Sequence, residues 1–400
     1  MADNEHFPFT CGPRGTPSGR YAALRENEPL GEVRVPSGDT VRIATRYEDV
    51  SMVLTDPRFS RDLNYPGAPR MYPGYTLTES PGTLIGMDPP EHTRLRRLMS
   101  GTFTPRQVNG WRPRLRRLAE DLADRLPEEF DFVADYAFPL PVQVICEVMG
   151  VPGIDFERVR RWSETLLSTS SLSKEEKAVS AMEFGAYCAE VIAEHRGAPG
   201  DGLLTAMIEA RDGTDQLTEV EPVRMTLSLF LAGHETTGSI MGRIAVRLLD
   251  PRDHYERLVA DPGLIPRATE ELFRVEVPGD TLTIRVATED VNLPSGTVRR
   301  GEGVIASFVG ANSDPAVFPS PEVMDIERTF TQSHMSLGRG PHYCLGANLA
   351  RAEVQEFIGA MVRRMPGLAL AVPADTIAWT SGISVNRPLA VLVRKSATPR

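Results

Sequence analysis

The sequence is poor in cysteine, in long apolar runs and in net positive charge. The four cysteines, Cys11, Cys146, Cys188 and Cys344, show no paired or zinc-like spacing, so we expect reduced thiols and a cytoplasmic protein. The N-terminus has no basic region followed by an apolar run, and no later stretch is long enough to span a bilayer. We therefore expect a soluble protein that does not bind membranes. The formal net charge of -10 argues against a general nucleic-acid binder.

The rest of the composition is that of a large globular protein. With 41% hydrophobic residues, a chain of 400 residues can bury a large core, and length alone would allow two or three domains. Helical spacing of apolar residues occurs at Arg46–Leu54, Leu118–Leu126, Pro141–Met149, Asp155–Leu167, Lys174–Arg196 and Met225–Leu249. Strand-like patterns occur at Glu32–Thr45, Thr281–Ala287, Val291–Ile305 and Ile377–Arg394, the first and last resembling hairpins. We expect a single, mainly α domain over residues 1–400, with a smaller β-rich region and an irregular start up to Arg20.

One stretch near the C-terminal end combines several glycines with Cys344. It runs from His334 to Arg351 as a loop that turns into a helix after Gly346. Unpaired N–H groups and the dipole at a helix N-terminus favour a thiolate, so we expect a lowered pKa for the Cys344 thiol. A buried cysteinate of this kind suits the axial ligand of haem. The alternative is a structural cysteine in a glycine-rich turn, which is the commoner case for a lone cysteine.

The long apolar segment Met225–Leu249 is interrupted by the polar run Ala232-Gly-His-Glu-Thr-Thr237. Polar residues inside a buried helix need a reason. Thr236 lies four residues after Ala232, so its hydroxyl can bond that carbonyl and bend the helix, while Gly233 leaves space beside the bend. The alternative is a kinked helix whose polar groups carry no chemistry.

A basic helix is predicted from Asp88 onward. Asp88 can cap it, and the prolines that follow occupy first-turn positions. His92 and Arg96 are one turn apart and share a face. The region also contains a basic cluster that could dock an acidic electron donor. This cluster consists of Arg94, Arg97, Arg106, Arg112, Arg114, Arg116 and Arg117. An ordinary solvated basic face is the alternative for both features.

The ten residues from Leu337 to Gly346, Leu-Gly-Arg-Gly-Pro-His-Tyr-Cys-Leu-Gly, resemble the haem-binding loop of the cytochrome P-450 family, Phe-Gly-x-Gly-x-His/Arg-x-Cys-x-Gly. Only the first position differs, because Leu337 replaces the usual Phe. The polar run of the long helix is similar to the family's oxygen-binding groove, Ala/Gly-Gly-x-Asp/Glu-Thr. The resemblance extends from about Arg20 to the C-terminus by the number and order of segments. It implies the cytochrome P-450 fold, with haem b between the long central helix and the Cys loop.

The resemblance also assigns roles to individual residues. Cys344 becomes the metal ligand, Thr236 hydrogen-bonds the bound oxygen, and Glu235 relays protons from solvent; His234 occupies the unspecified position of the pattern. The implied cofactor-binding residues are Cys344, His92, Arg96, Ala232, Gly233, Arg285, Gly338, His342 and Gly346. The four basic residues of this set would bind the two haem propionates. They are His92, Arg96, Arg285 and His342.

A buried charge network is expected near Glu271. Glu271 and Arg274 can pair on one helix face, although the Glu-x-x-Arg spacing is nonspecific and recurs in the chain. The family forms such a network at this place, and Arg328 fits its third position. The resemblance therefore implies a structural network that holds the haem-side loop.

Several segments are expected to border the substrate. The irregular segment Asn64–Thr83 is interpreted as a flexible pocket wall, with a plain surface connection as the alternative. Ser168–Ser173 resembles the family's lid region. The resemblance also places Val277–Ile284 and the turn Ser381–Ser384 at the pocket. The double proline expected within Val275–Asp280 is missing.

A protein of this family inserts one oxygen atom from O2 into an organic substrate and reduces the other to water. We therefore expect a monomeric monooxygenase acting on a small hydrophobic natural-product intermediate, such as a macrolide, peptide or terpenoid in antibiotic biosynthesis. No segment reads as a flavin or iron–sulfur module, so we expect electrons from a separate ferredoxin and ferredoxin reductase.

Two alternatives stay open from the sequence. One is a haem-thiolate enzyme that catalyses oxidative coupling, ring closure or rearrangement without oxygen insertion. The other is a non-catalytic protein of this fold that recruits a partner. The intact Glu235-Thr236 pair argues against the second alternative, because a binding module needs no proton relay.

Overall fold

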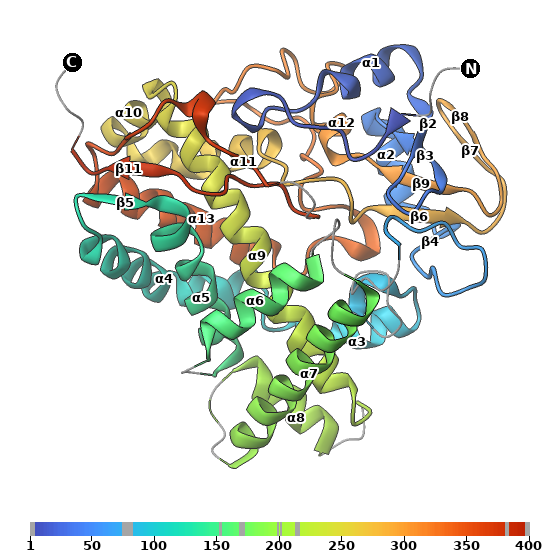
Figure 1. The fold of residues 1–400 in the computed structure, drawn as a ribbon, viewed down its shortest axis with the longest axis horizontal. Coiled ribbons are helices and arrows are strands. Elements are labelled where there is room, and N and C mark those ends of the chain that lie inside the picture. The colour runs from blue at the N-terminus through green and yellow to red at the C-terminus, as the bar shows by residue number, and fades with distance from the viewer. Residues whose placement is uncertain are drawn as a thin grey trace.

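The computed structural model describes residues 5–73, 83–151, 154–167, 173–197, 200, 202–212, 217–380 and 384–396. Helices form the larger part of the fold, and the largest sheet lies at one side (Figure 1). The helices are α1 (Gly19–Asn27), α2 (Tyr47–Thr55), α3 (Glu91–Ser100), α4 (Pro105–Arg125), α5 (Pro139–Met149), α6 (Phe156–Leu167), α7 (Lys174–Gly197), α8 (Leu203–Asp212), α9 (Glu221–Leu249), α10 (Asp253–Ala260), α11 (Ile265–Val275), α12 (Phe308–Asn312) and α13 (Ala347–Arg364). The strands are β1 (Glu5–His6), β2 (Leu30–Arg34), β3 (Thr40–Ala44), β4 (Phe59–Ser60), β5 (Glu129–Asp131), β6 (Ile284–Ala287), β7 (Val291–Leu293), β8 (Gly296–Val298), β9 (Gly303–Ala306), β10 (Ala369–Leu370) and β11 (Leu392–Arg394). The predicted mainly α fold with a smaller β-rich region is confirmed.

The largest sheet has the strand order β1-β2-β3-β9-β6-β4. β2 and β3 form the antiparallel hairpin predicted at Glu32–Thr45. β9 joins β3 in parallel, and β6 pairs antiparallel with β9. The strand predicted over Thr281–Ala287 is shorter than expected and begins at Ile284. The reason is that Thr283 turns back and donates its hydroxyl to the carbonyl of Asp280.

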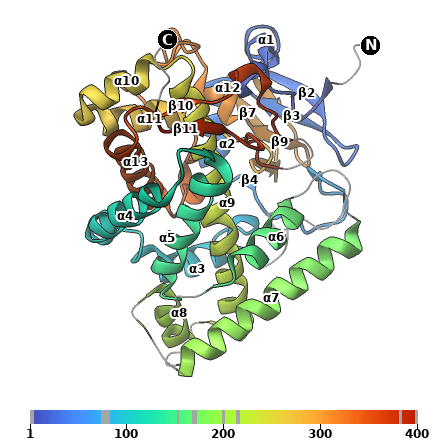
Figure 2. The ribbon, with the colours of Figure 1, turned by 60° about the vertical axis from the view of Figure 1, so that its left-hand side comes forward.

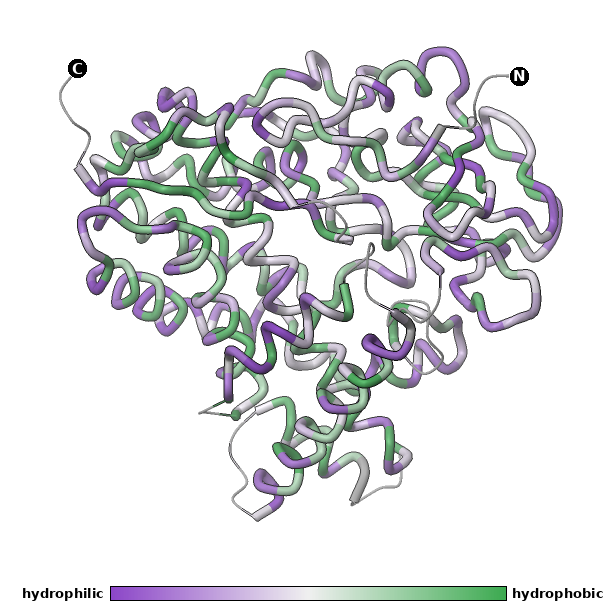
Figure 3. The backbone as a smooth tube through the Cα atoms, viewed as in Figure 1, coloured by the Kyte–Doolittle hydropathy of each residue, from purple (hydrophilic) through white to green (hydrophobic). Residues whose placement is uncertain are grey.

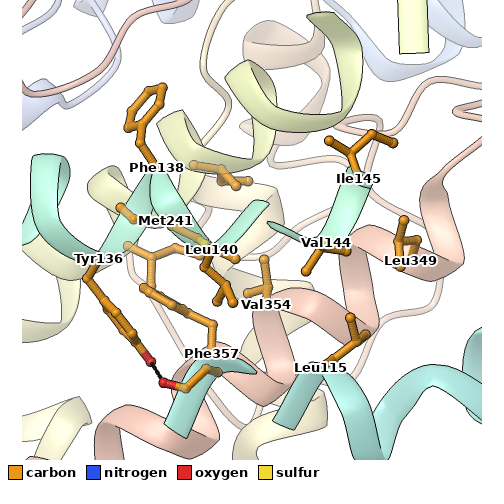
Figure 4. Packing of buried hydrophobic residues seen from close by; sticks show 14 of the residues in the cluster. Leu115, Tyr136, Phe138, Leu140, Val144, Ile145, Met241, Leu349, Val354 and Phe357 are labelled. Atoms are coloured by element: carbon orange, nitrogen blue, oxygen red, sulfur yellow. Dashed lines mark hydrogen bonds between the residues drawn. The ribbon is translucent and has the colours of Figure 1, made fainter. Parts of the chain in front are cut away.

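The helical core is built around α4, α5, α9 and α13. α13 packs along α4, and α9 runs through the middle of the molecule against α5 (Figure 1). In Figure 4, Phe357 of α13 lies beside Tyr136, with their ring centroids 5.2 Å apart. A buried hydroxyl needs a partner, and that of Tyr136 donates to the carbonyl of Ala119 at 3.1 Å. The turns of α4 alternate between hydrophilic and hydrophobic colour in Figure 3, as expected for a helix buried on one face.

The predicted helices are present, with shifted ends. α4 starts well before Leu118, at Pro105, because the side chain of Thr104 caps it by accepting the N–H of Gln107. α7 packs across α6 and α9 on the outside of the molecule (Figure 2). No helix in the described part of the chain is long and apolar enough to cross a membrane. Parts of three expected pocket walls, residues 74–82, 168–172 and 381–383, lie outside the described residues.

Asp88 does not cap α3, contrary to the prediction. The N-cap of α3 is Pro90, which has no capping side chain, and the helix begins at Glu91. The carboxylate of Asp88 instead accepts hydrogen bonds from the hydroxyl of Ser60 and from the backbone N–H of Arg61. The two prolines separate Asp88 from the first helical N–H groups, and β4 lies close enough to use its carboxylate.

The C-terminal segment Ile377–Arg394 forms only part of the predicted hairpin. Trp379 and Pro388 make an isolated antiparallel bridge. The last strand, β11, pairs instead with β10 on one side and β5 on the other. Pairing on both sides satisfies more backbone groups of β11 than a hairpin would, so the segment ends inside a three-stranded sheet.

The predicted charge network is present and buried. Arg274 donates two hydrogen bonds of 2.7 Å to Glu271, and Arg328 donates to the same carboxylate at 3.1 Å. Arg274 also donates to the carbonyl of Asn312. The side-chain oxygen of Asn312 accepts the N–H of Met335 at 2.6 Å, at the start of the Cys loop. The network therefore fixes where this loop begins.

The buried network predicts a large stability difference between two arginine variants. Arg274→Met leaves Glu271 buried with part of its charge unpaired, so we expect the free energy of unfolding to fall by about 3–5 kcal/mol. Arg257→Met removes an arginine paired with Glu327 at the surface and should cost less than about 1 kcal/mol. Denaturant unfolding of both variants measures the difference, and equal losses would contradict a structural role for the network.

Candidate haem-thiolate site

α9 is buried along most of its length, but one face is open. Leu229, Ala232 and Thr236 keep accessible surface, and spacings of three and four residues place them on the same side of the helix. Gly233 also keeps some accessible surface, but a Cβ added there would lie 2.9 Å from the side chain of Ile145 on α5. Gly233 therefore lets two helices approach closely, a role that the sequence did not indicate. Accessible surface on a helix inside the fold marks a cavity, and α9 forms one wall of it.

The hydrogen bond predicted inside α9 is confirmed. The Oγ1 atom of Thr236 donates to the carbonyl oxygen of Ala232, 2.6 Å away. This bond fixes the hydroxyl on the open face of the helix. The oxygen of that hydroxyl can still accept a hydrogen bond from a group in the cavity.

The Cys loop requires glycine at two positions. Gly338 and Gly340 have φ angles of 72° and 68°, in the left-handed region that other residues avoid. A Cβ at Gly340 would also lie 2.5 Å from the carbonyl oxygen of Leu54. The loop is closed by the N–H of Cys344, which donates to the carbonyl of Leu337 at 2.8 Å. These contacts hold the sulfur at the start of α13.

Cys344 lies deep in the molecule and still keeps accessible surface. A Cβ added at Gly346, two residues further on, would meet no atom within 4 Å. Burial raises the pKa of the Cys344 thiol, although the N–H of Gly346 and the charges of Arg96 and Arg351 act in the opposite direction. The lowered pKa expected from the helix start is therefore wrong for the polypeptide alone, because desolvation outweighs the helix end. A bound metal cation supplies the charge that deprotonates a coordinating thiol.

Glu270 of α11 holds both ends of the Cys loop, a role that sequence reasoning missed. Its carboxylate lies 3.3 Å from Nε2 of His334 and 2.8 Å from Nε of Arg351. Burial alone would raise the pKa of Glu270, but the neighbouring His334 and Arg351 lower it to about 2. The carboxylate therefore stays ionised near neutral pH. It fixes the loop and α13 relative to each other on either side of the sulfur.

The basic residues predicted to bind propionates converge from separate elements. The rings of His92 on α3 and His342 in the Cys loop have centroids 4.3 Å apart. Nε2 of His92 is buried and has no hydrogen-bond partner among the residues that the structure describes. In the described part of the chain, the Arg285 side chain on β6 donates only to the nearby carbonyls of Thr283 and Ile284. Arg96 reaches the loop by donating to the carbonyl of Tyr343.

A further cation, Arg61, joins this cluster without any signal in the sequence. It is buried and donates to the carbonyl of Ile284 at 2.6 Å. Burial and the charge of Arg61 hold the pKa of Arg285 well below its usual range, and burial together with Arg285 lowers the pKa of His342 to about 2. Asp88 is the carboxylate that offsets part of this charge. Buried positive charge in excess is costly, so the cluster fits the two propionates of haem, as Cys344 fits its iron.

Glu235 is fully buried beside Thr236. Its Oε1 lies 3.4 Å from Nε of Arg387, and Nη2 of Arg387 lies 3.2 Å from Glu164 on α6. Burial raises the pKa of Glu235 to about 7, with the charge of Arg387 acting in the opposite direction. A carboxyl group with this pKa can gain and lose a proton near neutral pH. Arg387 is 152 residues away in the chain, and no sequence pattern connects the two.

Known proteins resemble this chain over almost its whole length. A family model described as cytochrome P450 (written P-450 here) matches residues 264–366. The mycinamicin IV hydroxylase/epoxidase of Micromonospora griseorubida is 40% identical over 392 residues, which cover 97% of this chain and 98% of that protein. The chain belongs to the cytochrome P-450 family.

Other relatives of this P-450 agree. The nocardicin C N-oxygenase of Nocardia uniformis subsp. tsuyamanensis is 38% identical and covers 92% of the chain and 93% of its own length. The solved structure of the putative thioether synthase SgvP, involved in the tailoring step of griseoviridin, superposes with a TM-score of 0.92 at 37% identity, covering 98% of this chain and all of that one. The fold is therefore that of a P-450, the cofactor is haem held by a cysteine thiolate, and the enzyme is a monooxygenase.

The cation cluster of this P-450 predicts how firmly haem is held. Arg285→Gln removes a charge that we propose binds a propionate, so we expect haem to dissociate about ten- to a hundredfold faster. Arg42→Gln is the matched control, because Arg42 lies on the same sheet but pairs with Glu32 and Glu302 near the surface. Transfer of haem to an excess of apomyoglobin measures the rate. A variant that loses haem no faster than the control would remove Arg285 from the site.

Proposed function

We propose that this P-450 inserts one oxygen atom from O2 into a small hydrophobic natural-product intermediate of antibiotic biosynthesis, with Thr236 and Glu235 handling the protons. The observation that carries the proposal is a hydroxyl fixed on the open face of α9 beside a buried carboxyl group that titrates near neutral pH. Haem with a thiolate ligand supplies the activation of dioxygen, since the thiolate favours O–O cleavage. The names of two relatives, a hydroxylase/epoxidase and an N-oxygenase, support this reaction class.

The contacts support different roles for the neighbouring residues Thr236 and Glu235. Thr236 donates to the carbonyl of Ala232 and so presents its oxygen to the cavity as an acceptor. A water or oxygen ligand in the cavity can donate to it. Glu235 is buried and contacts Arg387, which in turn contacts Glu164 on α6. Glu164 is half-buried, so this chain of charged groups leads from the buried acid toward solvent.

We also propose that a separate ferredoxin and its reductase deliver electrons at the surface formed by α3 and α4. Arg97, Arg106 and Arg117 are exposed there. Arg96 of α3 bonds the carbonyl of Tyr343, and the Tyr343 side chain is exposed, so the Cys loop reaches the surface beside these arginines. Other members of the basic cluster are engaged in ion pairs within the protein. An acidic electron donor would therefore meet positive charge next to the loop that carries the thiolate.

We also propose that the protein is a single-domain monomer in the cytoplasm. None of the four cysteines forms a disulfide, which agrees with a reducing compartment. Oxidative coupling or ring closure stays the second candidate, because the structurally similar SgvP is named a putative thioether synthase. Product formed under labelled O2 separates the two: one labelled atom in the product supports insertion, and none supports coupling.

The role of Thr236 predicts uncoupling. Thr236→Val keeps the side-chain shape but removes the acceptor, so product formed per reductant consumed should fall about tenfold or more, with peroxide released instead. Thr226→Val is the matched control, because Thr226 lies buried on the same helix and its hydroxyl has no partner within the described residues. Parallel assays of reductant, product and peroxide measure the effect. Equal coupling in both variants would refute the assignment of Thr236.

The proposed docking surface predicts a charge effect on electron transfer. Arg117→Glu should raise the KM for a reduced ferredoxin about tenfold at low salt and much less at high salt, because steering is screened. Arg299→Glu, an exposed arginine near β8 on the other side of the molecule, should change little (Figure 1). Steady-state reduction kinetics at two salt concentrations provide the measurement. A similar effect in both variants would move the docking surface elsewhere.

A further inference from the structure

The polar run of α9 contains another buried titratable residue, His234, which the proposed function leaves without a role. It is fully buried, as Glu235 is. Its Nδ1 lies 2.5 Å from the carbonyl oxygen of Phe230, one turn earlier. A carbonyl oxygen only accepts hydrogen bonds, so Nδ1 carries the hydrogen. In a neutral imidazole the other nitrogen, Nε2, then presents a lone pair.

The carboxyl group of Glu235 lies near this nitrogen. The distance from Nε2 of His234 to Oε2 of Glu235 is 3.9 Å. Both atoms are buried, and neither has a hydrogen-bond partner elsewhere in the described ranges. Each unsatisfied buried polar atom costs about 1–3 kcal/mol, so two of them 3.9 Å apart call for an explanation. One hydrogen atom on Oε2 satisfies both, once the carboxyl group rotates to shorten the gap.

The charged groups around this pair are few. Arg387 lies 3.4 Å from the other oxygen of Glu235, Oε1, and Glu164 and Arg160 of α6 are the next charges toward that carboxyl group. Glu164 is also the charge that faces His234. Burial lowers the pKa of His234 to about 4 and raises that of Glu235 to about 7. The imidazole is therefore neutral near pH 7, where Glu235 exchanges its proton.

We propose that His234 is a positioning residue that accepts a hydrogen bond from the protonated Oε2 of Glu235 and so keeps a proton stored beside Thr236. Glu235 then has two states. When protonated, it donates from Oε2 to His234; when ionised, it pairs through Oε1 with Arg387. Its proton leaves toward the hydroxyl of Thr236 or a water on it, and one proton from solvent replaces it. This last transfer rests on the proposed function, whereas the hydrogen bond does not.

Infrared titration of the holoenzyme tests the hydrogen bond directly. The carbonyl stretch of a protonated carboxyl group is distinct from the bands of a carboxylate, and it moves to higher wavenumber when the O–H loses its acceptor. Subtraction of the spectrum of Glu235→Gln isolates the band of Glu235. We expect this band in acidic buffer and its loss near neutral pH. In His234→Leu the band should move to higher wavenumber.

Two further variants separate positioning from packing. His234→Gln can donate to the carbonyl of Phe230 and accept from Glu235, so the band should return to its wild-type position. His195→Leu removes another buried histidine, on α7, whose Nε2 is bonded to Thr205, and should leave the band unchanged. Product per reductant should fall about two- to tenfold in His234→Leu and recover in His234→Gln.

Two results would overturn the inference: a Glu235 band at the same position in wild-type and His234→Leu holoenzyme, or no protonated band for the wild type in acidic buffer. A different pattern would overturn only the relay. Suppose that the band behaves as expected but Glu235→Gln forms as much product per reductant as the wild type. The hydrogen bond is then supported and the proton route through Glu235 is refuted.

Discussion

The site depends on holding one sulfur atom at a fixed position deep in the fold. A flexible loop would leave that position undefined. Here the Cys loop is held at several points, because Glu270 bonds its two ends and Asn312 fixes Met335 at its start. On α9, Ala232 and Thr236 place two small side chains on the open face of the helix. The contacts of the Cys loop therefore hold Cys344 at the position where we propose that it binds haem.

Electrostatics complete this arrangement. The cluster of His92, Arg96, Arg285, His342 and Arg61 has more positive charge than Asp88 offsets, and burial weakens the protonation of several members. The polypeptide alone therefore has buried cations whose charge is only partly offset, and a buried neutral thiol. We propose that these cations and Cys344 would hold the propionates and the iron of haem, which would offset both penalties.

The sequence predicted what depends on short spacing. The hydrogen bond from Thr236 to Ala232 and the pairing of Glu271 with Arg274 follow from residues one helical turn apart, and both are present. The glycine-rich composition of the Cys loop was visible in the sequence, and the structure gives Gly338 and Gly340 left-handed φ angles. The sequence could not predict contacts made by tertiary packing, such as Arg387 with Glu235 or Glu270 with His334.

The wrong predictions have the same origin. Asp88 has the right residue type for a helix cap, but β4 uses its carboxylate after the chain folds. The thiol of Cys344 lies at a helix start, yet desolvation decides the direction of its pKa. In both cases a local rule competes with burial or with a distant partner, and the distant interaction prevails.

Ligation of the iron by Cys344 is the claim on which the rest of the account depends. The most direct test is the spectrum of the reduced, carbon-monoxide-bound protein, compared between the wild type and Cys344→Ser. The account predicts the position typical of a thiolate ligand in the wild type and its loss in the variant, with haem still bound by the cation cluster. A spectrum that is identical in both proteins would contradict it.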